Sequence, residues 1–340
     1  MSKVVTFGEI MLRLSPAGYN RFLQNGSFEA TFGGAEANVA VSLANYGVES
    51  AFVTRLPDHA IGRGAVHALR AFGVDTSAVV YGGERIGVYY VEKGAGERGS
   101  VCIYDRKHSA ISEASDGDFD WDTIFDGADW FHFTGITPAL GGQLSAICEN
   151  ACRAARRLGL TVSCDLNYRS KLWSREQAGE TMDRLCRYAD VCIANAEDAQ
   201  DVFGIAAADS DVTAGRLDRA GYMSVAHQLA SRFGFRKVAI TLRTSLSASD
   251  NLWQGMLFDG TDYAFSREHS IRIVDRVGGG DCFAAGLIYA LRSRMDTQSA
   301  VEFAASASAL GQTIEGDFNR VSADEVLRLM RGDASGRVQR

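Results

Sequence analysis

The sequence predicts an α/β fold in which helices cover both faces of a mostly parallel sheet. Short apolar runs with the length of buried strands recur along the chain, and segments with helical periodicity stand between most of them. Such an alternation of strand and helix is typical of parallel sheets that are covered on both sides. The predicted strands are Val4–Phe7, Ala51–Thr54, Trp130–Phe133, Leu160–Cys164, Val191–Ala194 and Lys237–Leu242.

The helices are predicted from their periodicity and from the way in which they end. In four of them a glycine stands just beyond the periodic stretch, where its left-handed conformation can close a helix. These glycines are Gly47, Gly73, Gly159 and Gly234. Because ligands of a parallel sheet gather at the carboxyl ends of its strands, we expect functional residues in the loops that follow the strands. The predicted helices span residues 35–47, 60–73, 142–158, 174–188, 220–233 and 279–294.

Two regions interrupt the alternation, residues 12–32 and 80–110. The first is too short and irregular for another strand–helix unit. The second holds two strand-like runs, residues 87–91 and 100–104, joined by a glycine-rich turn, which is the pattern of an antiparallel hairpin. Together the two regions predict a small sheet that stands off the main domain as a lid over a binding site. An ordinary extension of the edge of the main sheet is the alternative.

Composition restricts the classes of function. The chain has 340 residues, which suggests about two domains or one large α/β domain with an appendage. Its net charge is −7 without a basic stripe, so no nucleic-acid partner is expected. No apolar run reaches the ~18 residues of a membrane span, and the first residues are typical of a strand rather than of a signal peptide. Seven cysteines without a CxxC pair indicate a reducing compartment, so we expect a cytoplasmic protein.

Two polar segments are not expected to contribute to the core. Residues 209–220 are rich in charged side chains and predict a solvated excursion on the surface. Residues 331–340 lack apolar content and predict a loose tail. The folded domain is therefore expected to span residues 1–330.

A glycine-rich turn carries the strongest indication of chemistry. Gly278, Gly279, Gly280 and Asp281 stand between an apolar run and the predicted helix 279–294. Glycine lets backbone N–H groups approach an anion, and the start of a helix adds its positive dipole end. A carboxylate beside such an anion hole suits phosphoryl transfer, because it can accept the proton of the attacking hydroxyl group. A tight turn in which the carboxylate only stabilises the start of the helix is the alternative.

A second glycine motif points to a known family. Gly33 and Gly34 open the predicted helix that carries Asn38, and the Asp275-x-x-Gly-x-Gly-Asp281 motif follows much later in the chain, with the hairpin between them. In these motifs and their order the chain resembles the ribokinase-like family of carbohydrate kinases, also called the PfkB family.

The resemblance implies a fold and a reaction for nearly the whole chain. The fold is a three-layer α/β/α domain with a mostly parallel central sheet and a small β-sheet lid. The reaction is ATP-dependent phosphorylation of a sugar hydroxyl group, with Asp281 as general base and the N–H groups of residues 278–281 as anion hole. Gly279 stands where the family usually has alanine.

Three further segments are similar to those of 2-keto-3-deoxygluconate kinases within this family. They begin with Ile103-Tyr-Asp-Arg106, Thr134-Gly-Ile-Thr-Pro-Ala and Asp165-Leu-Asn-Tyr-Arg169. The resemblance implies that the 6-hydroxyl group of this sugar acid is phosphorylated. The residues expected to bind it are Gly33, Gly34, Asn38, Tyr89, Tyr104, Arg106 and Arg169.

Two arginines support an acidic substrate. Arg169 follows the end of a predicted strand and can hold a carboxylate through two parallel hydrogen bonds. Arg106 follows a lid strand and adds a second cation for the carboxylate or for phosphate. For Arg169, a salt bridge at the start of the following helix is the alternative.

The expected nucleotide site matches the family less completely. Asn195, Glu197 and Asp198 occupy the family's Asn-x-x-Glu motif, and either carboxylate can serve Mg²⁺ through water. Thr241 and Arg243 stand where the family often has Thr-x-Gly, so the guanidinium of Arg243 would reach a phosphate instead of a backbone contact. The resemblance implies ATP and Mg²⁺ as cofactors, and the expected nucleotide contacts are Asn195, Thr241, Arg243, Gly278 and Gly280.

Other functions remain as alternatives. A neutral-sugar kinase of the fructokinase or ribokinase type is disfavoured by Arg106 and Arg169. A non-catalytic sugar-binding regulator is disfavoured by the intact glycine turn with Asp281. A dinucleotide oxidoreductase is disfavoured because no G-x-G-x-x-G follows the first strand. With a sugar acid and ATP as small-molecule partners, we also expect a homo-oligomer, either a dimer through the lid or a higher assembly.

Overall fold

The structure is a computed structural model of the chain and describes residues 2–195, 197–206 and 219–332. Most of the polar segment 209–220 therefore lies outside the described residues, and its last two residues begin a helix. The predicted tail lies outside the described residues from position 333 onward.

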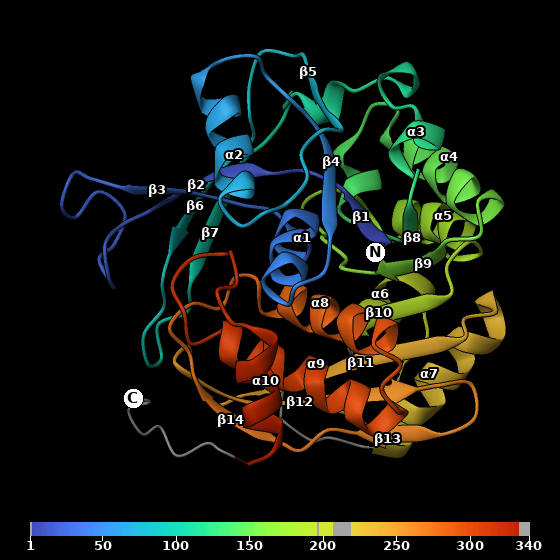
Figure 1. Cartoon of the computed structure of the whole chain (residues 1–340). Helices are drawn as coiled ribbons and strands as arrows, with labels where there is room; N and C mark the ends of the chain where they lie inside the picture. Colours follow the sequence, from blue (N-terminus) through green and yellow to red (C-terminus); the bar gives the residue numbers. More distant parts are fainter. Residues whose placement is uncertain (1, 196, 207–218, 333–340) are drawn as a thin grey trace.

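A ten-stranded sheet runs through the middle of the protein (Figure 1). Its strands are β1 (Lys3–Phe7), β4 (Ser50–Leu56), β5 (Val79–Tyr81), β8 (Ala128–Thr134), β9 (Thr161–Asp165), β10 (Val191–Asn195), β11 (Lys237–Ser245), β12 (Asp250–Phe258), β13 (Tyr263–Phe265) and β14 (His269–Arg272). The order is β13-β12-β11-β10-β9-β8-β1-β4-β5, and β14 pairs with β12. From β11 to β5 all pairs are parallel, whereas β12 runs antiparallel to its three partners. The mostly parallel sheet confirms the predicted fold class.

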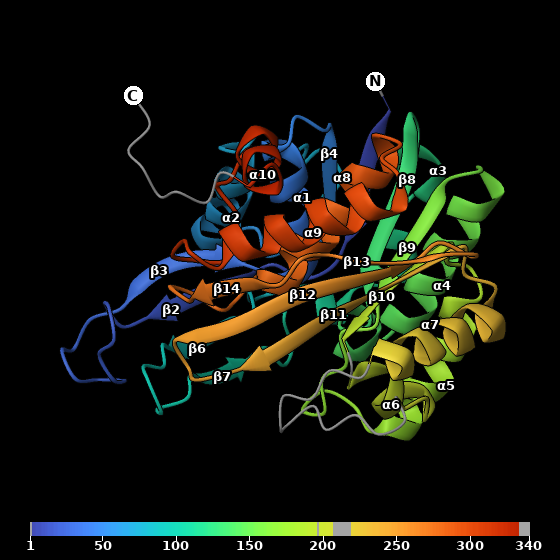
Figure 2. The same ribbon diagram turned by 90° about the horizontal axis from the view of Figure 1, so that it is seen from below.

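Helices cover both faces of this sheet, as the alternation of strands and helices predicted. The helices are α1 (Ala35–Asn45), α2 (Ala60–Arg70), α3 (Trp121–Ile124), α4 (Leu144–Arg157), α5 (Arg175–Cys186), α6 (Asp198–Phe203), α7 (Arg219–Phe233), α8 (Gly279–Arg292), α9 (Thr297–Gly311) and α10 (Ala323–Met330). Short 3₁₀ helices span Ile111–Glu113, Asp116–Asp118 and Thr137–Leu140. Figure 2 shows α8, α9 and α10 on one side of β11 and β12, and α4, α5 and α7 on the other. None of the helices among the described residues combines the length and the apolar character needed to cross a bilayer.

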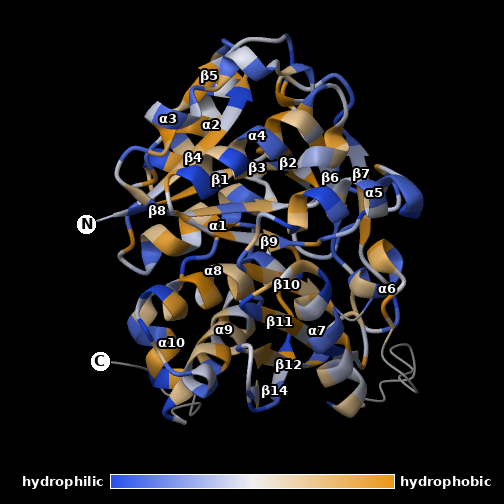
Figure 3. Ribbon diagram, turned by 90° about the vertical axis from the view of Figure 1, so that its right-hand side faces the viewer, coloured by the Kyte–Doolittle hydropathy of each residue, from blue (hydrophilic) through white to orange (hydrophobic). Residues whose placement is uncertain are grey.

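The main sheet has a large hydrophobic core on each face, because successive side chains of a strand point to opposite faces. On β10, Val191 and Ile193 pack with α8 and α9, whereas Cys192 and Ala194 face the opposite core with α4, α5 and α7. In Figure 3 hydrophobic colours concentrate on the central strands, and the covering helices carry both hydrophobic and hydrophilic turns. The parallel strands are therefore buried on both faces, which is why they appear in the sequence as continuous apolar runs.

A second sheet of four strands forms the lid at one end of the main sheet (Figure 1). Its strands are β2 (Met11–Ser15), β3 (Glu29–Gly33), β6 (Val88–Glu92) and β7 (Val101–Asp105), in the order β3-β2-β6-β7. The hairpin of β6 and β7 was predicted, and so was the contribution of the first region. The start of the second region differs from the prediction. Residues 79–81 pair with β4 in the main sheet, and the part of this region that belongs to the lid begins only at Val88.

Candidate active site

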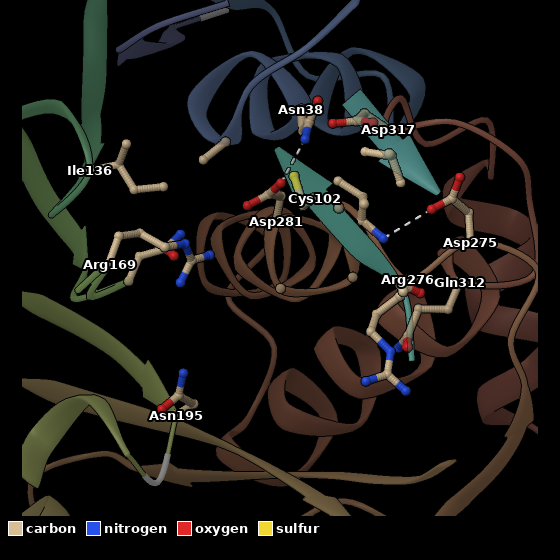
Figure 4. Close-up of a pocket in the computed structure, with 18 of the residues that line it drawn as sticks. Asn38, Cys102, Ile136, Arg169, Asn195, Asp275, Arg276, Asp281, Gln312 and Asp317 are labelled. Atoms are coloured by element: carbon tan, nitrogen blue, oxygen red, sulfur yellow. Dashed lines mark hydrogen bonds between the residues drawn. The ribbon is translucent and has the colours of Figure 1, made fainter. Parts of the chain in front are cut away.

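A cavity of about 750 Å³ lies at the carboxyl end of the central sheet and beneath the lid. Its walls come from β6 and β7, from the segments at the ends of β9, β10 and β11, and from the first turns of α1 and α8. Figure 4 shows side chains from these elements around one space. With one exception, Gly33, the cavity brings together every residue predicted for the site: Gly34, Asn38, Tyr89, Tyr104, Arg106, Arg169, Asn195, Glu197, Asp198, Thr241, Arg243, Gly278, Gly279, Gly280 and Asp281.

The glycine-rich turn forms the start of α8 and presents backbone N–H groups to the cavity. Gly278 has a φ of 85°, and a Cβ at this position would lie 2.7 Å from the carbonyl oxygen of Asp317, so only glycine fits. Within the described chain, the N–H groups of Gly278, Gly280 and Asp281 have no hydrogen-bond acceptor. Three such donors at the positive end of a helix make an anion-binding site.

The carboxyl group of Asp281 stands directly beside these donors. The side-chain amide of Asn38 donates a 2.7 Å hydrogen bond to its Oδ2 atom (Figure 4). Burial, assisted by the negative charges of Asp317 and Glu36, raises the pKa of Asp281 to about 7, although the hydrogen bond from Asn38 and the charge of Arg169 oppose the rise. A carboxyl group that titrates near neutral pH is well matched to the work of a general base.

If Asp281 is the general base that the sequence predicts, its raised pKa predicts an acid limb in the pH profile of activity. A base must be deprotonated to accept a proton, so kcat/KM is expected to fall as the pH drops through about 7. The hydrogen bond from Asn38 holds the pKa down, so Asn38→Ala should move this limb to higher pH. The measurement is kcat/KM against pH at saturating MgATP in both proteins. A limb that stays in place in Asn38→Ala would belong to the substrate or to another residue.

Two more carboxylates lie at the ends of neighbouring strands. Asp165 ends β9, and its pKa is raised well above the usual range by burial and by the nearby Asp198 and Asp281. Burial also raises the pKa of Asp198 to about 6, against the opposing charge of Arg169. This spacing of acidic groups across two strand ends gives the cavity an oxygen-rich wall.

This oxygen-rich wall fits a hydrated Mg²⁺ ion. Mg²⁺ prefers oxygen ligands and usually keeps several waters. Among the described residues no three acidic, histidine or cysteine side chains are close enough to hold a metal ion directly. Asn195 uses its side-chain oxygen to accept the N–H groups of Glu197 and Asp198, both at 2.8 Å, which leaves its amide nitrogen turned toward the cavity (Figure 4). The side chains of this wall would therefore contact Mg²⁺ through water molecules.

Three arginines of the cavity have no carboxylate partner within the part of the chain that the structure describes: Arg169, Arg243 and Arg276. Arg169 donates from Nη1 to the carbonyl oxygen of Tyr168 at 3.0 Å and otherwise extends toward Asp281 (Figure 4). Burial and the nearby Arg243 lower the pKa of Arg276, and its Nε atom is buried without a partner. Arginines without a direct ion pair keep donors free for an anion, although the charge of Arg169 also acts on the nearby Asp198 and Asp281.

Arg106 differs from the other cavity arginines because Glu9 already neutralises it. Its Nε atom donates to Glu9 Oε2 at 2.8 Å, and Ser109 donates to the other carboxylate oxygen at 2.6 Å. Glu9 is only 3% exposed. Arg106 is thus held rigidly at the cavity wall as half of an ion pair, and it is not the free second cation that its position in the sequence predicted.

The tyrosines of the lid form the upper wall of the cavity. The rings of Tyr89 and Tyr104 stack with centroids 5.9 Å apart, and the hydroxyl group of Tyr89 donates to Asp317 Oδ2 at 2.5 Å. Tyr104 remains partly exposed. Tyr89 therefore holds the lid in place, and Tyr104 offers the accessible ring.

The glycine pair before α1 is explained by close packing. A Cβ at Gly34 would lie 2.0 Å from the carbonyl oxygen of Glu9, and one at Gly33 would lie 2.1 Å from the carboxylate of Asp317. Gly33 does not line the cavity, so a substrate contact of this residue stays a prediction without support from the geometry.

Several residues of the site were not predicted from the sequence. They are Glu9, Asp165, Arg276 and Asp317, which line the cavity, and Arg13, which lies outside the lining and pairs with Asp317. For Arg13 a signal existed, since it is the only charged residue of strand β2 and stands between two leucines. The contacts of Asp317 with the lid could not be predicted, because its partners Arg13 and Tyr89 lie far away in the sequence.

The lid touches the main domain at its tip as well as at its base. Gly96, in the turn between β6 and β7, accepts from the N–H group of Ala248 at 2.8 Å and donates to Ser249 Oγ at 2.9 Å. Lys93 pairs with Glu315 at 2.6 Å. These polar contacts are solvent-exposed or partly so, and contacts of this kind can open and close.

Hydrogen exchange should report the closing of this lid. We expect the amides of Val88 to Tyr104 to exchange more slowly when the sugar expected from the sequence is bound, because a closed lid keeps water away from the cavity. The measurement compares exchange with and without sugar, and the buried strand β8 is the internal control. Equal exchange of the lid in both states would contradict a closing motion.

Comparisons with known proteins agree with this geometry. Residues 1–317 match the model of the pfkB family carbohydrate kinases. The solved structure of 2-dehydro-3-deoxygluconokinase from Thermotoga maritima is 49% identical in sequence, with a TM-score of 0.94 over 98% of this chain and 100% of that one. A 2-dehydro-3-deoxygalactonokinase from Haloferax volcanii is 32% identical over 98% of both chains. A 2-dehydro-3-deoxygluconokinase from Bacillus subtilis is 27% identical over 95% of this chain and 93% of its own.

Proposed function

The chain belongs to the pfkB family of carbohydrate kinases, and on this premise we propose that it phosphorylates the 6-hydroxyl group of 2-keto-3-deoxygluconate with ATP. This sugar acid is the 2-dehydro-3-deoxygluconate named for the Thermotoga maritima kinase, which is 49% identical to the chain. The observation that carries the proposal is the guanidinium of Arg169, which has no carboxylate partner among the described residues and extends toward Asp281. A substrate carboxylate bound there would hold the sugar beside the base.

Asp281 and the glycine-rich turn act on the two reacting groups. The carboxylate of Asp281 accepts the proton of the 6-hydroxyl group as that oxygen attacks the γ-phosphorus of ATP, and the bond from this phosphorus to the β–γ bridging oxygen breaks to release ADP. The N–H groups of Gly278, Gly280 and Asp281 stabilise the negative charge on the phosphoryl group during its transfer. Electrostatic stabilisation of this kind is usually the largest single contribution to catalysis. Asn38 orients the base through its hydrogen bond.

The nucleotide is proposed to lie along the wall that carries Asn195, Thr241 and Arg243. Arg243 and Arg276 supply positive charge for its phosphates, and neither is neutralised by a carboxylate within the described chain. Mg²⁺ would be held through water by Asn195, Glu197 and Asp198, and it would neutralise part of the charge on the phosphates.

Recognition of the acid rests on the difference between the two arginines near the sugar. Arg169 is free to make a charge-assisted, two-point hydrogen bond with a carboxylate. Arg106 is fixed by Glu9 and stacks over the ring of Tyr104, with its guanidinium carbon 5.4 Å from the ring centroid. We therefore assign the substrate charge to Arg169, and to Arg106 the positioning of Tyr104 and a secondary polar contact.

Two other substrates compete with this proposal. The Haloferax volcanii relative is named for 2-dehydro-3-deoxygalactonate, a sugar acid that the same cations would bind. The higher identity to the Thermotoga maritima kinase favours the gluconate form. A neutral ketose would leave Arg169 unpaired in the cavity, so it is expected to be a much weaker substrate.

The proposal is tested by a screen of ADP release with purified protein and ATP. The acceptors are the two sugar acids, fructose and ribose, each tested over a range of concentrations. We expect the highest kcat/KM with 2-keto-3-deoxygluconate. A higher kcat/KM with 2-keto-3-deoxygalactonate would change the assigned sugar, and a higher one with fructose or ribose would overturn the assignment to a sugar acid.

A homo-oligomer formed through the lid stays a prediction. Val101 and Ile103 on β7 are exposed apolar side chains at the edge of the lid sheet, as an interface there requires.

A further inference from the structure

A buried arginine of the lid, Arg13, connects the segment before the catalytic turn, which carries Asp275, with the segment that carries Asp317. Arg13 stands on β2 and is 3% exposed. Its Nη2 atom lies 2.5 Å from Asp275 Oδ2, and its Nη1 atom lies 2.6 Å from Asp317 Oδ1. Its Nε atom donates to Ser15 Oγ at 2.9 Å, so the guanidinium is fixed on three sides.

Asp275 transmits the position of Arg13 to the turn. Its Oδ1 atom accepts the N–H group of Val277 at 3.2 Å, and its Oδ2 atom accepts that of Gly316 at 3.3 Å. Val277 is the residue directly before Gly278, where the anion hole begins. The carboxylate thus ties the guanidinium of a lid residue to the backbone that presents the catalytic N–H groups.

Asp317 makes the second connection. Its carbonyl oxygen packs so closely on Gly278 that a Cβ there would lie 2.7 Å away. Its carboxylate accepts from Arg13 and also from the hydroxyl group of Tyr89 on β6. Two lid strands therefore reach the side chain of Asp317, and the backbone carbonyl group of the same residue supports the back of the turn.

The cluster sets one buried guanidinium against two buried carboxylates, and burial raises the pKa of Asp317. Asp275 and Asp317 are 3% and 5% exposed, and buried carboxylates are costly unless they are paired. Burial opposes the charge of Arg13, but Asp317 and Asp275 hold its pKa above the usual value. A planar guanidinium can bridge two carboxylates at once, which an ammonium group does less well.

We propose that Arg13 is a positioning residue that couples the lid to catalysis, because its guanidinium holds Asp275 and Asp317 and through them the backbone of the catalytic turn. The inference rests on the proposed function, in that the turn is taken as the phosphoryl-binding element. Arg13 itself does not line the cavity, so it acts through other residues and touches no substrate.

The test compares Arg13→Met and Arg13→Lys with the wild type and with Arg21→Met. Arg21 is an exposed arginine of the lid that pairs with Glu92 at 3.1 Å, so its loss removes a lid ion pair without touching the catalytic turn. Each protein is measured for kcat, for KM of the sugar acid, and for hydrogen exchange over residues 274–282 and 88–104 without ligands. Arg13→Met leaves two buried carboxylates without a cation and could fail to fold for that reason. In that case the triple variant Arg13→Met, Asp275→Asn, Asp317→Asn replaces it, because both carboxylates are then neutral amides.

We expect Arg13→Met to lower kcat by about 10–100-fold, since a displacement of ~1 Å in a catalytic group costs on that order. KM for the sugar acid should change far less. Exchange of the turn and of the lid should become faster together, Arg13→Lys should recover only part of kcat, and Arg21→Met should behave as the wild type.

Three results would overturn the proposal. One is an unchanged kcat in a folded Arg13→Met or triple variant. A second is a rise in KM at constant kcat, which would mean that Arg13 serves binding. The third is faster exchange in the lid alone, with the turn unaffected. If the wild type phosphorylates no sugar acid, the proposed function fails, and the exchange of residues 274–282 still decides whether Arg13 couples the two parts.

Discussion

Asp281→Asn is expected to retain the fold and sugar binding and to lose nearly all turnover. The substitution keeps the shape of the side chain, and its amide oxygen can still accept the hydrogen bond from Asn38. It removes the negative charge and the basicity of the carboxylate that takes the proton of the hydroxyl group, and loss of a general base typically lowers kcat by ~10²–10⁴-fold. The measurement is kcat at saturating ATP and sugar acid, together with the affinity of the variant for the sugar acid by calorimetry.

Asp122→Asn is the matched control for this variant. It removes one negative charge from an exposed side chain of α3 that lies outside the cavity lining. It should leave kcat unchanged. If Asp281→Asn kept more than about a tenth of the wild-type kcat, the carboxylate would not be the general base.

Arg169→Ala is expected to raise KM for 2-keto-3-deoxygluconate by roughly 10–100-fold. A charge-assisted hydrogen bond contributes on the order of 1.5–3 kcal/mol, and ~1.4 kcal/mol corresponds to tenfold. KM for fructose, where that sugar is accepted, should change far less. Arg169→Lys should recover only part of the affinity, because an ammonium group lacks the planar fork.

Arg243→Ala is the control for this prediction. Arg243 lines the same cavity on the side of the proposed nucleotide, so its loss should raise KM for ATP and leave KM for the sugar acid nearly unchanged. Equal losses of kcat/KM for the acid and for fructose in Arg169→Ala would show that Arg169 acts on the phosphate or on the structure. The assignment to a sugar acid would then lose its main physical support.

The layered fold was predictable because its signals are local. Each parallel strand is buried on both faces and therefore appears as an apolar run, and helices such as α1 and α4 end at a glycine that the sequence displays. α9 was not predicted, because residues 303–309 are all buried and the helix shows no polar face in that stretch. β12 was not predicted, because the buried polar side chains of Asn251 and Gln254 break its apolar pattern.

In the site, too, residues within sequence motifs could be predicted, whereas contacts between distant segments could not. Motif residues such as Asn38 and Asp281 were recognised from their neighbours in the sequence, and the structure joins them by a hydrogen bond. The pairing of Arg106 with Glu9 was not predictable, because it depends on the approach of segments that are 97 residues apart. The ion pairs of Arg13 span 262 and 304 residues, and no spacing in the sequence reveals such contacts.

The central claim is transfer of a phosphoryl group to the 6-hydroxyl group of a sugar acid with Asp281 as base. The most direct measurement is ³¹P and ¹H NMR of the product formed from ATP and 2-keto-3-deoxygluconate, by the wild type and by Asp281→Asn. The account predicts a single phosphate monoester coupled to the C6 protons with the wild type, and almost none with the variant over the same time. No monoester with the wild type, a monoester at another carbon, or equal product with Asp281→Asn would contradict it.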